Sequence, residues 1–384
     1  MKRLLLLTNT RRHLDAALKH PYQVTVLTEH PWHVDHPNCT CIHVPAFQDL
    51  HLQDALALLP GAADAVVALT DEATVLAADL AWHYRTTPHR AQGARWMKHK
   101  DQMRRRLAAH APQHNVPHLV DPSAQDVEAF LTRYREVIIK PGSATGSQLI
   151  HHVSTQDQAS AALDAIRAAH LQPLVEQFMR GQEYSVESFS YAGDHQIIAI
   201  TDKYKNQHFV EMGHQVPARL TPAQTATIQE AVRAVLTALD HHDGPGHTEV
   251  ILNDHGCFVV EAHPRLGGDK ITTLVELVYG IDLAEQAVMW AVDRTTLAVN
   301  PSARGSAATV FFDPSVAASL PQAAHAAFEA HPHVAAWKLP AGAAHPAAPY
   351  RSSRDRQGYV VYHHPESPHA HQHAQDWLTE VHYD

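Results

Sequence analysis

Residues 248–262 read TEVILNDHGCFVVEA, two apolar runs separated by a short polar segment. The β-branched and aromatic residues of both runs favour strands, and Asn, Asp, His and Gly at 253–256 are typical of a hairpin turn. With a three-residue loop at 254–256, Glu249 and Glu261 are each six positions from residue 255. They then lie opposite each other in the hairpin, with both carboxylates on the same face.

Two carboxylates that face each other in apolar strands repel unless a positive group lies between them. Mg²⁺ takes oxygen ligands and often bridges carboxylates to phosphate oxygens. The sequence therefore predicts a magnesium site at Glu249 and Glu261, with Mn²⁺ as a substitute. The alternative is that Arg265 or Lys270 neutralises the two carboxylates.

A second candidate site lies upstream, where the β-branched run 137–139 leads into Lys140 and a loop of small residues at 141–147. Small residues let backbone N–H groups approach an anion, and a lysine at the end of a strand supplies a charge to it. The lysine precedes the glycines, so the segment is not a Walker A loop. The alternative is a hairpin with an incidental lysine.

An acidic turn follows at residues 176–183. Glu176 and Glu183 flank a turn at Gly181, with Phe178 and Met179 between them. Such a segment can present a carboxylate to ribose hydroxyls and backbone groups to adenine. The alternative is an ordinary acidic surface turn.

Two further segments place charged residues beside glycine. Arg265 precedes the paired glycines 267 and 268, and an arginine in such a place can bind a carboxylate or a phosphate bidentately. In the other segment, a charged turn at 202–205 is followed by Glu211 and His214 on either side of Gly213. The alternatives are a surface arginine and a solvated charged turn.

The bulk composition indicates a folded protein without a basic surface. The chain has 384 residues, which predicts two or three domains, and its formal net charge of -10 argues against nucleic-acid binding. The 34 histidines exceed the need of any one site, so we expect most of them at the surface. For the His-rich segment 363–374, a solvated tail is expected and metal binding is the alternative.

Cysteine spacing and hydrophobic run lengths bear on the location of the chain. The three cysteines, at 39, 41 and 257, have neither disulfide-framework nor zinc spacing. The apolar run at 4–7 is too short for a signal peptide, and no run is long enough to span a membrane. We therefore expect a cytoplasmic protein with small-molecule partners, and we leave a homodimer open.

Alternating strand and helix patterns over residues 1–95 predict a small open α/β domain. Its strands are expected at 4–7, 23–27, 40–44 and 65–68, and its helices at 51–59 and 71–83. Residues 8–10, after the first strand, contain no glycine, so the domain is not a Rossmann dinucleotide-binding domain.

An α+β domain is expected at 96–302, with a lid subdomain at about 96–175 and a catalytic subdomain at about 176–302. A strand-rich C-terminal subdomain at 303–384 is expected to complete the catalytic half. The expected helices are 98–109, 156–170, 221–240 and 271–290, and the expected strands are 137–140, 148–152, 173–178, 183–191, 196–203, 247–252 and 257–263.

The order of these segments resembles the ATP-grasp superfamily from about residue 96 to 300. The resemblance implies ATP and Mg²⁺ as cofactors. Glu249 and Glu261 match its magnesium pair, and Arg265 matches the arginine that stabilises the acyl phosphate. Lys100 and Lys140 match its two nucleotide-binding lysines, and its flexible phosphate loop is matched by Ser143, Thr145, Gly146 and Ser147. Its adenine hinge is matched by Glu176, Gln177, Phe178 and Met179, and its ribose-binding acid by Glu183.

Within the superfamily, residues 201–203 and 209–217 look most like the L-amino acid ligases, which make dipeptides or close relatives. This resemblance implies a ligase that activates a carboxylate with ATP as an acyl phosphate, joins it to an amine, and releases ADP and phosphate. It also implies catalytic roles for Lys203, which would hold phosphates, and for Arg265. From their position we further expect His214 or Glu211 to act in catalysis by orienting or deprotonating the ammonium of the amine substrate. The residues that would face the substrates are Glu211, His214, Arg265, Gly267, Gly268 and Asp269.

One position departs from the family pattern. Many ATP-grasp ligases have asparagine two residues after the second magnesium glutamate, whereas this chain has His263. Imidazole can bind a metal, but Mg²⁺ prefers oxygen, so the number of metal ions, one or two, is left open. Two other functions also fit: a carboxylase that phosphorylates bicarbonate, as in purine or biotin metabolism, and a non-catalytic nucleotide-binding regulator.

Overall fold

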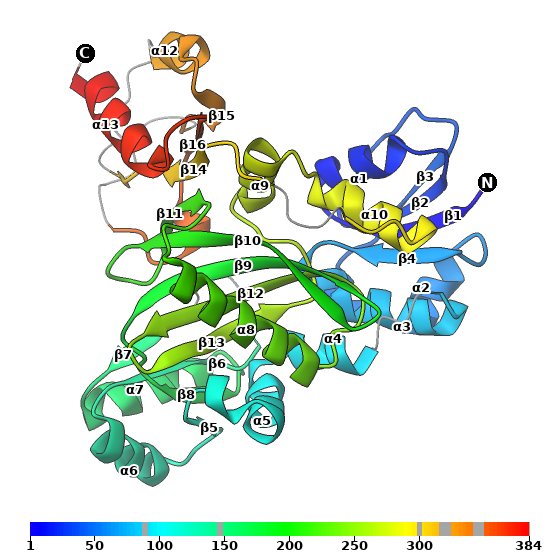
Figure 1. Ribbon diagram of the computed structural model, residues 1–384. Coiled ribbons are helices and arrows are strands. Elements are labelled where there is room, and N and C mark those ends of the chain that lie inside the picture. The colour runs from blue at the N-terminus through cyan, green and yellow to red at the C-terminus, as the bar shows by residue number, and fades with distance from the viewer. Residues whose placement is uncertain (87–90, 144–148, 298–301, 315–323, 341–348, 384) are drawn as a thin grey trace.

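A computed structural model gives the structure of residues 1–86, 91–143, 149–297, 302–314, 324–340 and 349–383. These residues form three sheets with helices packed against them (Figure 1). The first sheet, drawn in blue, lies at the right of Figure 1 beside α10, and the second small sheet, drawn in teal, lies below strands β12 and β13 of the large sheet. Within the described residues, none of the helices has the length and hydrophobicity that crossing a bilayer requires.

The first sheet is parallel and has the strand order β3-β2-β1-β4. In β1, Leu4 and Leu6 join one buried cluster, while Leu5 and Leu7 join another, because successive side chains point to opposite faces. The elements are β1 Arg3–Leu7, α1 Arg11–Leu18, β2 Gln23–Thr28, β3 Cys39–His43, η1 Phe47–Asp49, α2 Leu52–Leu58, β4 Ala65–Ala68, η2 Asp71–Ala73 and α3 Thr74–Tyr84. The open α/β architecture predicted for this segment is confirmed.

The second sheet is antiparallel and has the strand order β5-β8-β6-β7. Helices α6 and α7 pack on it, and each begins with a capping box, at Ser123 and at Thr155. The elements are β5 His118–Val120, α6 Ala124–Tyr134, β6 Val137–Pro141, β7 His151–Val153, α7 Gln156–Ala168 and β8 Pro173–Gln177. We call this unit the lid sheet.

The third sheet has the order β13-β12-β9-β10-β11-β14-β16-β15 among the described residues, and all its pairings are antiparallel. The elements before residue 264 are α4 Ala91–Lys98, α5 Lys100–His110, η3 Pro112–His114, β9 Gln182–Tyr191, β10 Asp194–Lys205, β11 Glu211–Val216, α8 Pro222–Ala238, β12 Gly244–Asn253 and β13 Gly256–His263. The later ones are α9 Ile271–Tyr279, α10 Leu283–Asp293, β14 Ser306–Phe311, α12 Ala324–Ala330, β15 Val334–Lys338, η4 Ser353–Asp355, β16 Tyr359–His364 and α13 Ala370–Tyr383.

One predicted helix is interrupted in the structure, so that prediction was wrong. The segment 271–290 forms α9 and α10, because Gly280 ends α9 with a φ of 70° and the Asp282 side chain caps α10 by accepting from the N–H groups of Ala284 and Glu285. The predicted helix 98–109 is confirmed over most of its length as α5, which begins at Lys100 because the backbone of His99 is extended between α4 and α5.

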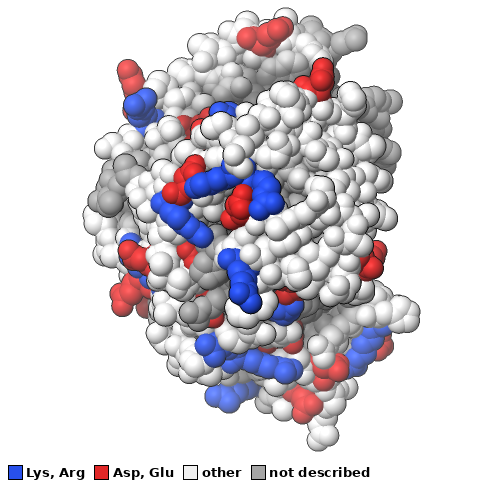
Figure 2. Space-filling model, turned by 90° about the vertical axis from the view of Figure 1, so that its right-hand side faces the viewer, with Lys and Arg blue, Asp and Glu red and all other residues white. Residues whose placement is uncertain are grey.

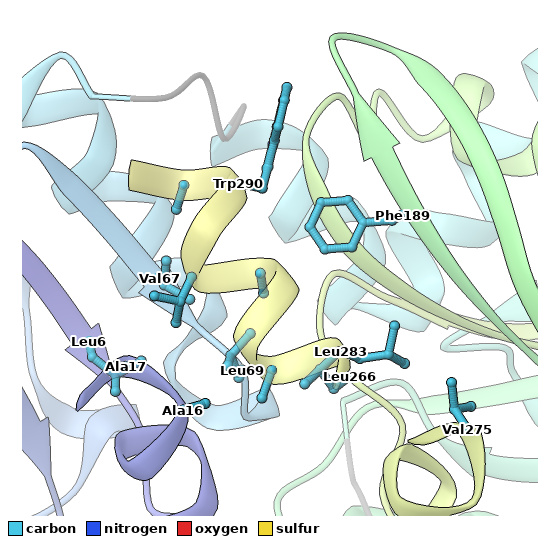
Figure 3. Close-up of a cluster of buried hydrophobic side chains, with 14 of the residues drawn as sticks. Leu6, Ala16, Ala17, Val67, Leu69, Phe189, Leu266, Val275, Leu283 and Trp290 are labelled. Atoms are coloured by element: carbon cyan, nitrogen blue, oxygen red, sulfur yellow. The ribbon is translucent and has the colours of Figure 1, made fainter. Parts of the chain in front are cut away.

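Helix α10 connects the first sheet with the large sheet. Figure 3 shows it between Val67 and Leu69 on one side and Phe189 of β9 on the other. Leu283 and Trp290 of α10 belong to the same buried cluster as these residues. Burial of apolar surface on both sides of one helix therefore fixes the first sheet against the large sheet.

The hairpin of β12 and β13 differs from the predicted one in its loop and agrees with it in its register. Asn253 pairs with Gly256, so the loop has two residues rather than three. A β-bulge lies between the pairs Val250–Val259 and Glu249–Glu261, and it leaves Val260 as the extra residue of β13. The bulge compensates for the shorter loop, so Glu249 and Glu261 are paired as predicted.

Arg104 of α5 satisfies the backbone of this bulge. Its guanidinium donates to the carbonyl oxygens of Val259 and Val260 at 2.7 and 2.9 Å, and its Nε lies 2.5 Å from Oε1 of Glu176 on β8. Carbonyls of consecutive residues point to opposite edges of a regular strand, so one guanidinium reaches both because the strand is bulged. The side chain is 0% exposed, so its charge depends on Glu176 for neutralisation.

Replacing Arg104 with Met should lower the free energy of unfolding by about 3–5 kcal/mol, because Glu176 would then lose a charged partner within the protein interior. The measurement is urea unfolding followed by circular dichroism. Arg105→Met is the matched control, since Arg105 is the next residue on α5 and is exposed. An equal and small effect of both substitutions would contradict the role given to Arg104.

His371 anchors α13 to the large sheet. Its ring stacks on Tyr204 of β10, with centroids 3.6 Å apart, and a Cβ at Gly213 of β11 would lie 2.6 Å from its Nε2. Burial, and then the charges of His214 and Arg219, lower the pKa of His371 to about 4. The C-terminal helix is therefore held by an imidazole that is neutral at physiological pH.

The stability of the protein should fall as the pH drops from 6.5 towards 4. The unfolded chain, with a histidine pKa of about 6.5, binds more protons in this window than the folded chain does at His371, so acid favours unfolding. At pH 5 this residue should cost roughly 2 kcal/mol. In His371→Phe, the loss of unfolding free energy between pH 7 and pH 5 should be smaller by about that amount. His255→Phe, at an exposed histidine, should keep the pH dependence of the parent protein.

Candidate functional site

A cavity of about 420 Å³ is lined by the lid sheet on one side and by the β12–β13 hairpin on the other. The loop between β10 and β11 contributes Asn206 and Phe209 to its wall. The predicted nucleotide-binding residues in the lining are Lys100, Lys140, Glu176, Gln177, Phe178, Met179 and Glu183. The predicted metal, catalytic and substrate residues in the lining are Glu211, Glu249, Glu261, His263 and Arg265.

Other predicted site residues lie elsewhere. Ser143 is exposed at the end of β6, and Lys203 is buried behind the carboxylates of the cavity wall. His214, Gly267, Gly268 and Asp269 are not among the residues that line the cavity, so their substrate role stays a prediction. Thr145, Gly146 and Ser147 lie outside the described residues.

Lys203 of β10 is surrounded by three carboxylates. Its Nζ lies 2.7 Å from Glu183, 2.7 Å from Glu249 and 3.5 Å from Glu211, and one oxygen of each carboxylate lies within 4.8 Å of the others. Burial alone would lower the pKa of Lys203, but the three negative charges raise it well above its ordinary value. Glu183 also pairs with Lys205. The Lys203 ammonium is therefore the counter-ion that allows three glutamate carboxylates to lie close together in a buried position.

Glu249 has a second partner in His247, on the same face of β12. His247 Nε2 lies 3.3 Å from Glu249 Oε1, and its Nδ1 lies 2.5 Å from Glu187 Oε1. Burial lowers the pKa of His247, but the two carboxylates, Glu187 first, outweigh it and raise the pKa to about 9. Glu187 also accepts the N–H of Gly267 at 3.0 Å. The glycine turn at Gly267 is therefore linked to Glu249 through a buried carboxylate and an imidazolium.

Glu261 is held by residues from two other parts of the chain. Lys100 Nζ of α5 lies 2.7 Å from its Oε2, and His263 Nε2 lies 3.1 Å from its Oε1. His263 Nδ1 in turn lies 3.1 Å from Oδ1 of Asp71, which follows β4 in the first sheet. Burial raises the pKa of Glu261, but Lys100 and His263 lower it well below its ordinary value. Glu261 is therefore an anion at neutral pH.

Lys140 and Glu176 form an ion pair between neighbouring strands of the lid sheet, with Nζ 2.8 Å from Oε2. Burial raises the pKa of Glu176, but Arg104 and Lys140 bring it down to about 2. Lys140, near the end of β6, thus lies in the cavity wall with its ammonium positioned by a carboxylate, as expected for a phosphate-binding lysine.

Aromatic side chains close the end of the cavity beside the predicted adenine hinge. The Phe178 ring lies 4.2 Å from the His152 ring and 6.3 Å from the Phe209 ring, measured between centroids. Phe209 has a φ of 62°, which a bulky residue rarely adopts, and its backbone is held by bonds within the loop to Asn206. The hinge therefore offers an apolar wall of the kind that suits a planar base.

Asp269 joins the C-terminal part of the chain to the site. Arg356 donates to both of its oxygens, at 2.7 and 2.6 Å, and also to the backbone oxygen of Glu211 at 3.0 Å. His214 Nε2 lies 3.2 Å from Asp269, and the Arg356 guanidinium stacks on Phe311 at 3.7 Å. His214 is consequently a buried partner of Asp269, and Glu211 is the residue of this group that lines the cavity.

The donor set of the cavity fits a divalent cation. Glu249 and Glu261 offer carboxylate oxygens, the ligands that Mg²⁺ prefers. In the structure, Lys203 and His247 neutralise the carboxylate of Glu249, and Lys100 neutralises that of Glu261. The alternative neutralisation predicted from the sequence, by Arg265 or Lys270, is wrong for these pairs: the Arg265 Nε lies 3.8 Å from Asp71, and Lys270 lies over the ring of Tyr359.

Comparison with known proteins identifies the central part of the chain. A family model described as ATP-grasp domain matches residues 134–273. The chain contains an ATP-grasp domain. This match runs from the end of α6 into α9, so it includes Lys140, the hinge, Glu249, Glu261 and Arg265. The superfamily resemblance predicted from the sequence is confirmed.

Curated relatives are similar over part of their length. A segment of 120 residues is 35% identical to the uncharacterized protein y4rH of Sinorhizobium fredii, and it covers 31% of this chain and 24% of that protein. A segment of 135 residues is 29% identical to carnosine synthase 1 of Homo sapiens, and it covers 34% of this chain and 16% of that protein. The similarity thus spans a quarter or less of these relatives.

Solved structures are similar to this chain over nearly its whole length, including the parts before and after the ATP-grasp domain. The L-amino acid ligase from Bacillus licheniformis has a TM-score of 0.80 at 18% identity, covering 99% of this chain and 97% of that chain. The carboxyaminoimidazole ribonucleotide synthase from Aspergillus clavatus, complexed with ATP, has a TM-score of 0.75 at 16% identity, covering 99% and 98%. At these identities the likeness shows the fold.

Several residues that shape the site were missed by the sequence reasoning. Each contacts a site residue that is distant in sequence: Arg104 contacts Glu176, Asp71 contacts His263, Glu187 contacts His247, and Arg356 contacts Asp269. Each is also a common residue type in a segment without a recognisable motif. His247 carried a signal, because it lies two residues before Glu249 and therefore on the same face of the strand.

Charges on the outer surface are mixed. On the face that Figure 2 shows, lysine and arginine side chains lie beside aspartate and glutamate side chains, and uncharged surface separates the groups. Among the side chains described on that face, we see no continuous basic surface of the kind that nucleic-acid-binding proteins present.

Gly267→Ala should destabilise the protein by about 1–3 kcal/mol, because the added Cβ would lie 2.7 Å from Glu187 Oε1 and Glu187 is buried against His247. Thermal unfolding measures the effect. Gly268→Ala is the matched control, since a Cβ there meets nothing within 4 Å. Equal melting temperatures for the two variants would show that the Gly267–Glu187 contact yields easily.

Proposed function

We propose that this chain is an ATP-dependent ligase that joins a carboxylate to an amine through an acyl phosphate. The observation that carries the proposal is the meeting of two lysines and two hairpin glutamates in one cavity: Lys100 and Lys140 share it with Glu249 and Glu261. A nucleoside triphosphate needs lysines to bind its phosphates and carboxylates to bind its metal ion. The ATP-grasp domain supports the same nucleotide.

ATP would occupy the cavity along its length. Its base would lie at the hinge, against Phe178 and Met179, and its ribose near Glu183. Lys140 and Lys100 would exchange their present carboxylate partners for phosphate oxygens. The proposed phosphate loop begins at Ser143. This arrangement uses residues that already line one continuous space.

Glu249 and Glu261 would hold Mg²⁺, as one ion or two. When bound, Mg²⁺ supplies charge that neutralises the phosphate oxygens during phosphoryl transfer. Lys203, buried among Glu183, Glu211 and Glu249, would keep that end of the site from carrying three uncompensated negative charges. We propose this supporting electrostatic role for Lys203 because it lies behind the carboxylates of the wall.

The reaction would proceed in two steps. A carboxylate oxygen of the first substrate attacks the γ-phosphorus of ATP, a new P–O bond forms, and the bond to ADP breaks. The amine then attacks the acyl carbon, and phosphate leaves with the former carboxylate oxygen. Arg265, in the cavity wall beside His263, would stabilise the negative charge of the tetrahedral intermediate.

Glu211 is the residue that we propose to orient the ammonium of the second substrate and to accept its proton. Burial raises the pKa of Glu211, and the negative charges of Glu249 and Asp269 raise it further. The positive charge of Lys203 acts in the opposite direction but does not cancel the increase. A carboxylate with a raised pKa is a better proton acceptor than an ordinary one. The predicted partner in this role, His214, is buried against Asp269 and would act by holding that carboxylate.

Amino acids are the substrate class that we propose for the pair. Two of the similar proteins, named L-amino acid ligase and carnosine synthase 1, support this choice. The carboxylate of one amino acid and the amine of another, or an organic acid and an amino acid, would form the amide.

A carboxylase that phosphorylates bicarbonate is the second candidate. The structural likeness to carboxyaminoimidazole ribonucleotide synthase supports it, with a TM-score close to that of the amino acid ligase. Phosphate release from ATP across pairs of amino acids and organic acids, with and without bicarbonate, separates the two functions. ATP turnover that needs bicarbonate and no amino acid pair would overturn the ligase proposal.

Glu261→Gln should abolish amino-acid-dependent ADP formation while the fold survives, because the neutral amide cannot balance the charge of a divalent cation. The loss should be at least 100-fold, measured by coupled ADP detection. Glu230→Gln, on the exposed face of α8, should retain full activity. Unchanged circular dichroism with near-complete activity in Glu261→Gln would remove Glu261 from the proposed metal site.

A further inference from the structure

The turn between β16 and α13 is organised around the ring of His364. The backbone N–H groups of Glu366 and Ser367 donate to its Nδ1 at 3.3 and 3.0 Å. A backbone N–H can only donate, so this nitrogen carries a lone pair and no proton. An imidazolium, in contrast, has N–H donors at both ring nitrogens. Protonation of His364 at Nδ1 therefore removes both hydrogen bonds and sets a new donor against two others.

Ser367, which His364 positions, determines where α13 begins. The Ser367 carbonyl accepts from the hydroxyl of Ser306 on β14 at 2.6 Å, and its Oγ accepts the N–H of His369 at 3.2 Å. The Ser306 hydroxyl in turn accepts the N–H of Ala370, the first residue of α13, at 3.0 Å. Loss of the hydrogen bonds to His364 would therefore loosen the start of the helix.

The same turn is attached to β11. Gln215 of β11 accepts the N–H of His371 at 3.0 Å and donates to the carbonyl of Pro368 at 3.1 Å. This strand also carries Glu211 and His214, two of the predicted substrate residues. The turn therefore supports a strand that the proposed active site uses.

The groups that face His364 favour its neutral form. Its ring stacks on those of His333, which precedes β15, and His373 of α13, with centroids 4.5 and 5.1 Å apart. Burial is the largest cause that lowers the pKa of His364, and the charges of these two histidines and of His363 lower it further. Glu366 acts in the opposite direction without cancelling the decrease. The imidazole is therefore a neutral acceptor at physiological pH.

A second imidazole contacts α13 in the same state. Nδ1 of His331 accepts the backbone N–H of His333 at 3.2 Å, and the His331 ring lies 4.5 Å from the Trp377 ring of α13, measured between centroids. Burial, and then the charge of His333, lower the pKa of His331, while Glu380 acts in the opposite direction. Protonation at Nδ1 would remove this hydrogen bond as well.

We propose that residues 364–371 form an acid-sensitive switch, in which protonation of His364 opens the turn and releases α13 from β11. The closed turn holds the pKa of His364 below its ordinary value, so the open turn binds more protons, and opening becomes more favourable as the pH falls below about 6.5. On release, the pKa of His371 returns from about 4 to that of an ordinary histidine, and the proton that it takes up reinforces the opening. The switch does not depend on the proposed reaction, because it is a property of the folded chain alone.

Hydrogen exchange of the full chain, followed by mass spectrometry at pH 7.5 and pH 5.5, tests the proposal. After correction for intrinsic exchange rates, the opening constant of α13 should rise on acidification, while α7, which contains no histidine, should keep its protection. His364→Asn provides an oxygen that can accept the two N–H groups and does not titrate. Its rise in the opening constant should be roughly three- to tenfold smaller than that of the parent protein.

Two further variants separate His364 from the other histidines. His255→Asn is the matched control, since His255 is exposed at the tip of the β12–β13 hairpin, and it should show the same rise as the parent protein. The double variant His331→Asn with His371→Phe keeps a ring against Tyr204 and leaves His364 as the titrating residue of the three. Acid-dependent opening of α13 should persist in it.

An equal rise in the parent protein and in folded His364→Asn would overturn the proposal. Protection of α13 that is independent of pH in the parent protein would do the same. If His364→Asn leaves α13 unprotected already at pH 7.5, the double variant decides, because an opening that disappears in it assigns the trigger to His331 or His371. Only backbone exchange is measured, so each outcome is independent of whether a substrate pair yields ADP.

Discussion

The buried guanidinium of Arg104 is the interaction on which the arrangement of the site depends. It joins α5, the lid sheet through Glu176, and the large sheet through the carbonyls of Val259 and Val260. Those carbonyls are available together because the strand is bulged, and the bulge in turn restores the pairing of Glu249 with Glu261. One charge without access to water therefore fixes both the approach of the lid sheet and the register of the acidic pair.

Charge balance organises the cavity around that pair. The described carboxylates of the wall are each matched by a cation from another strand or helix: Lys203 for Glu183 and Glu249, Lys100 for Glu261, and Lys140 for Glu176. A buried pair of this kind contributes little net stability, yet it positions both groups accurately. In the proposed reaction Lys100 and Lys140 would exchange carboxylates for phosphates within the cavity that they already line.

Parts of the chain outside the ATP-grasp domain also reach the site. Asp71 follows β4 of the first sheet and orients His263, while Arg356 follows η4 and holds Asp269 beside Glu211. Helix α10 packs the first sheet against the large one, so these contacts rest on a shared apolar core. The matched family segment, residues 134–273, therefore describes the central machinery, and the flanking parts position it.

The sequence alone determined the hairpin with its facing glutamates, the lysine at the end of β6, and the ATP-grasp architecture, because strand periodicity and motif order are local properties that can be read along the chain. It did not determine the two-residue loop and compensating bulge, the partners of the carboxylates, or the burial of His214. Those depend on Arg104 meeting a strand 155 residues away and on Asp71 meeting His263 across 192 residues. Contacts at such separations have no local pattern, so only the packed sheets decide them.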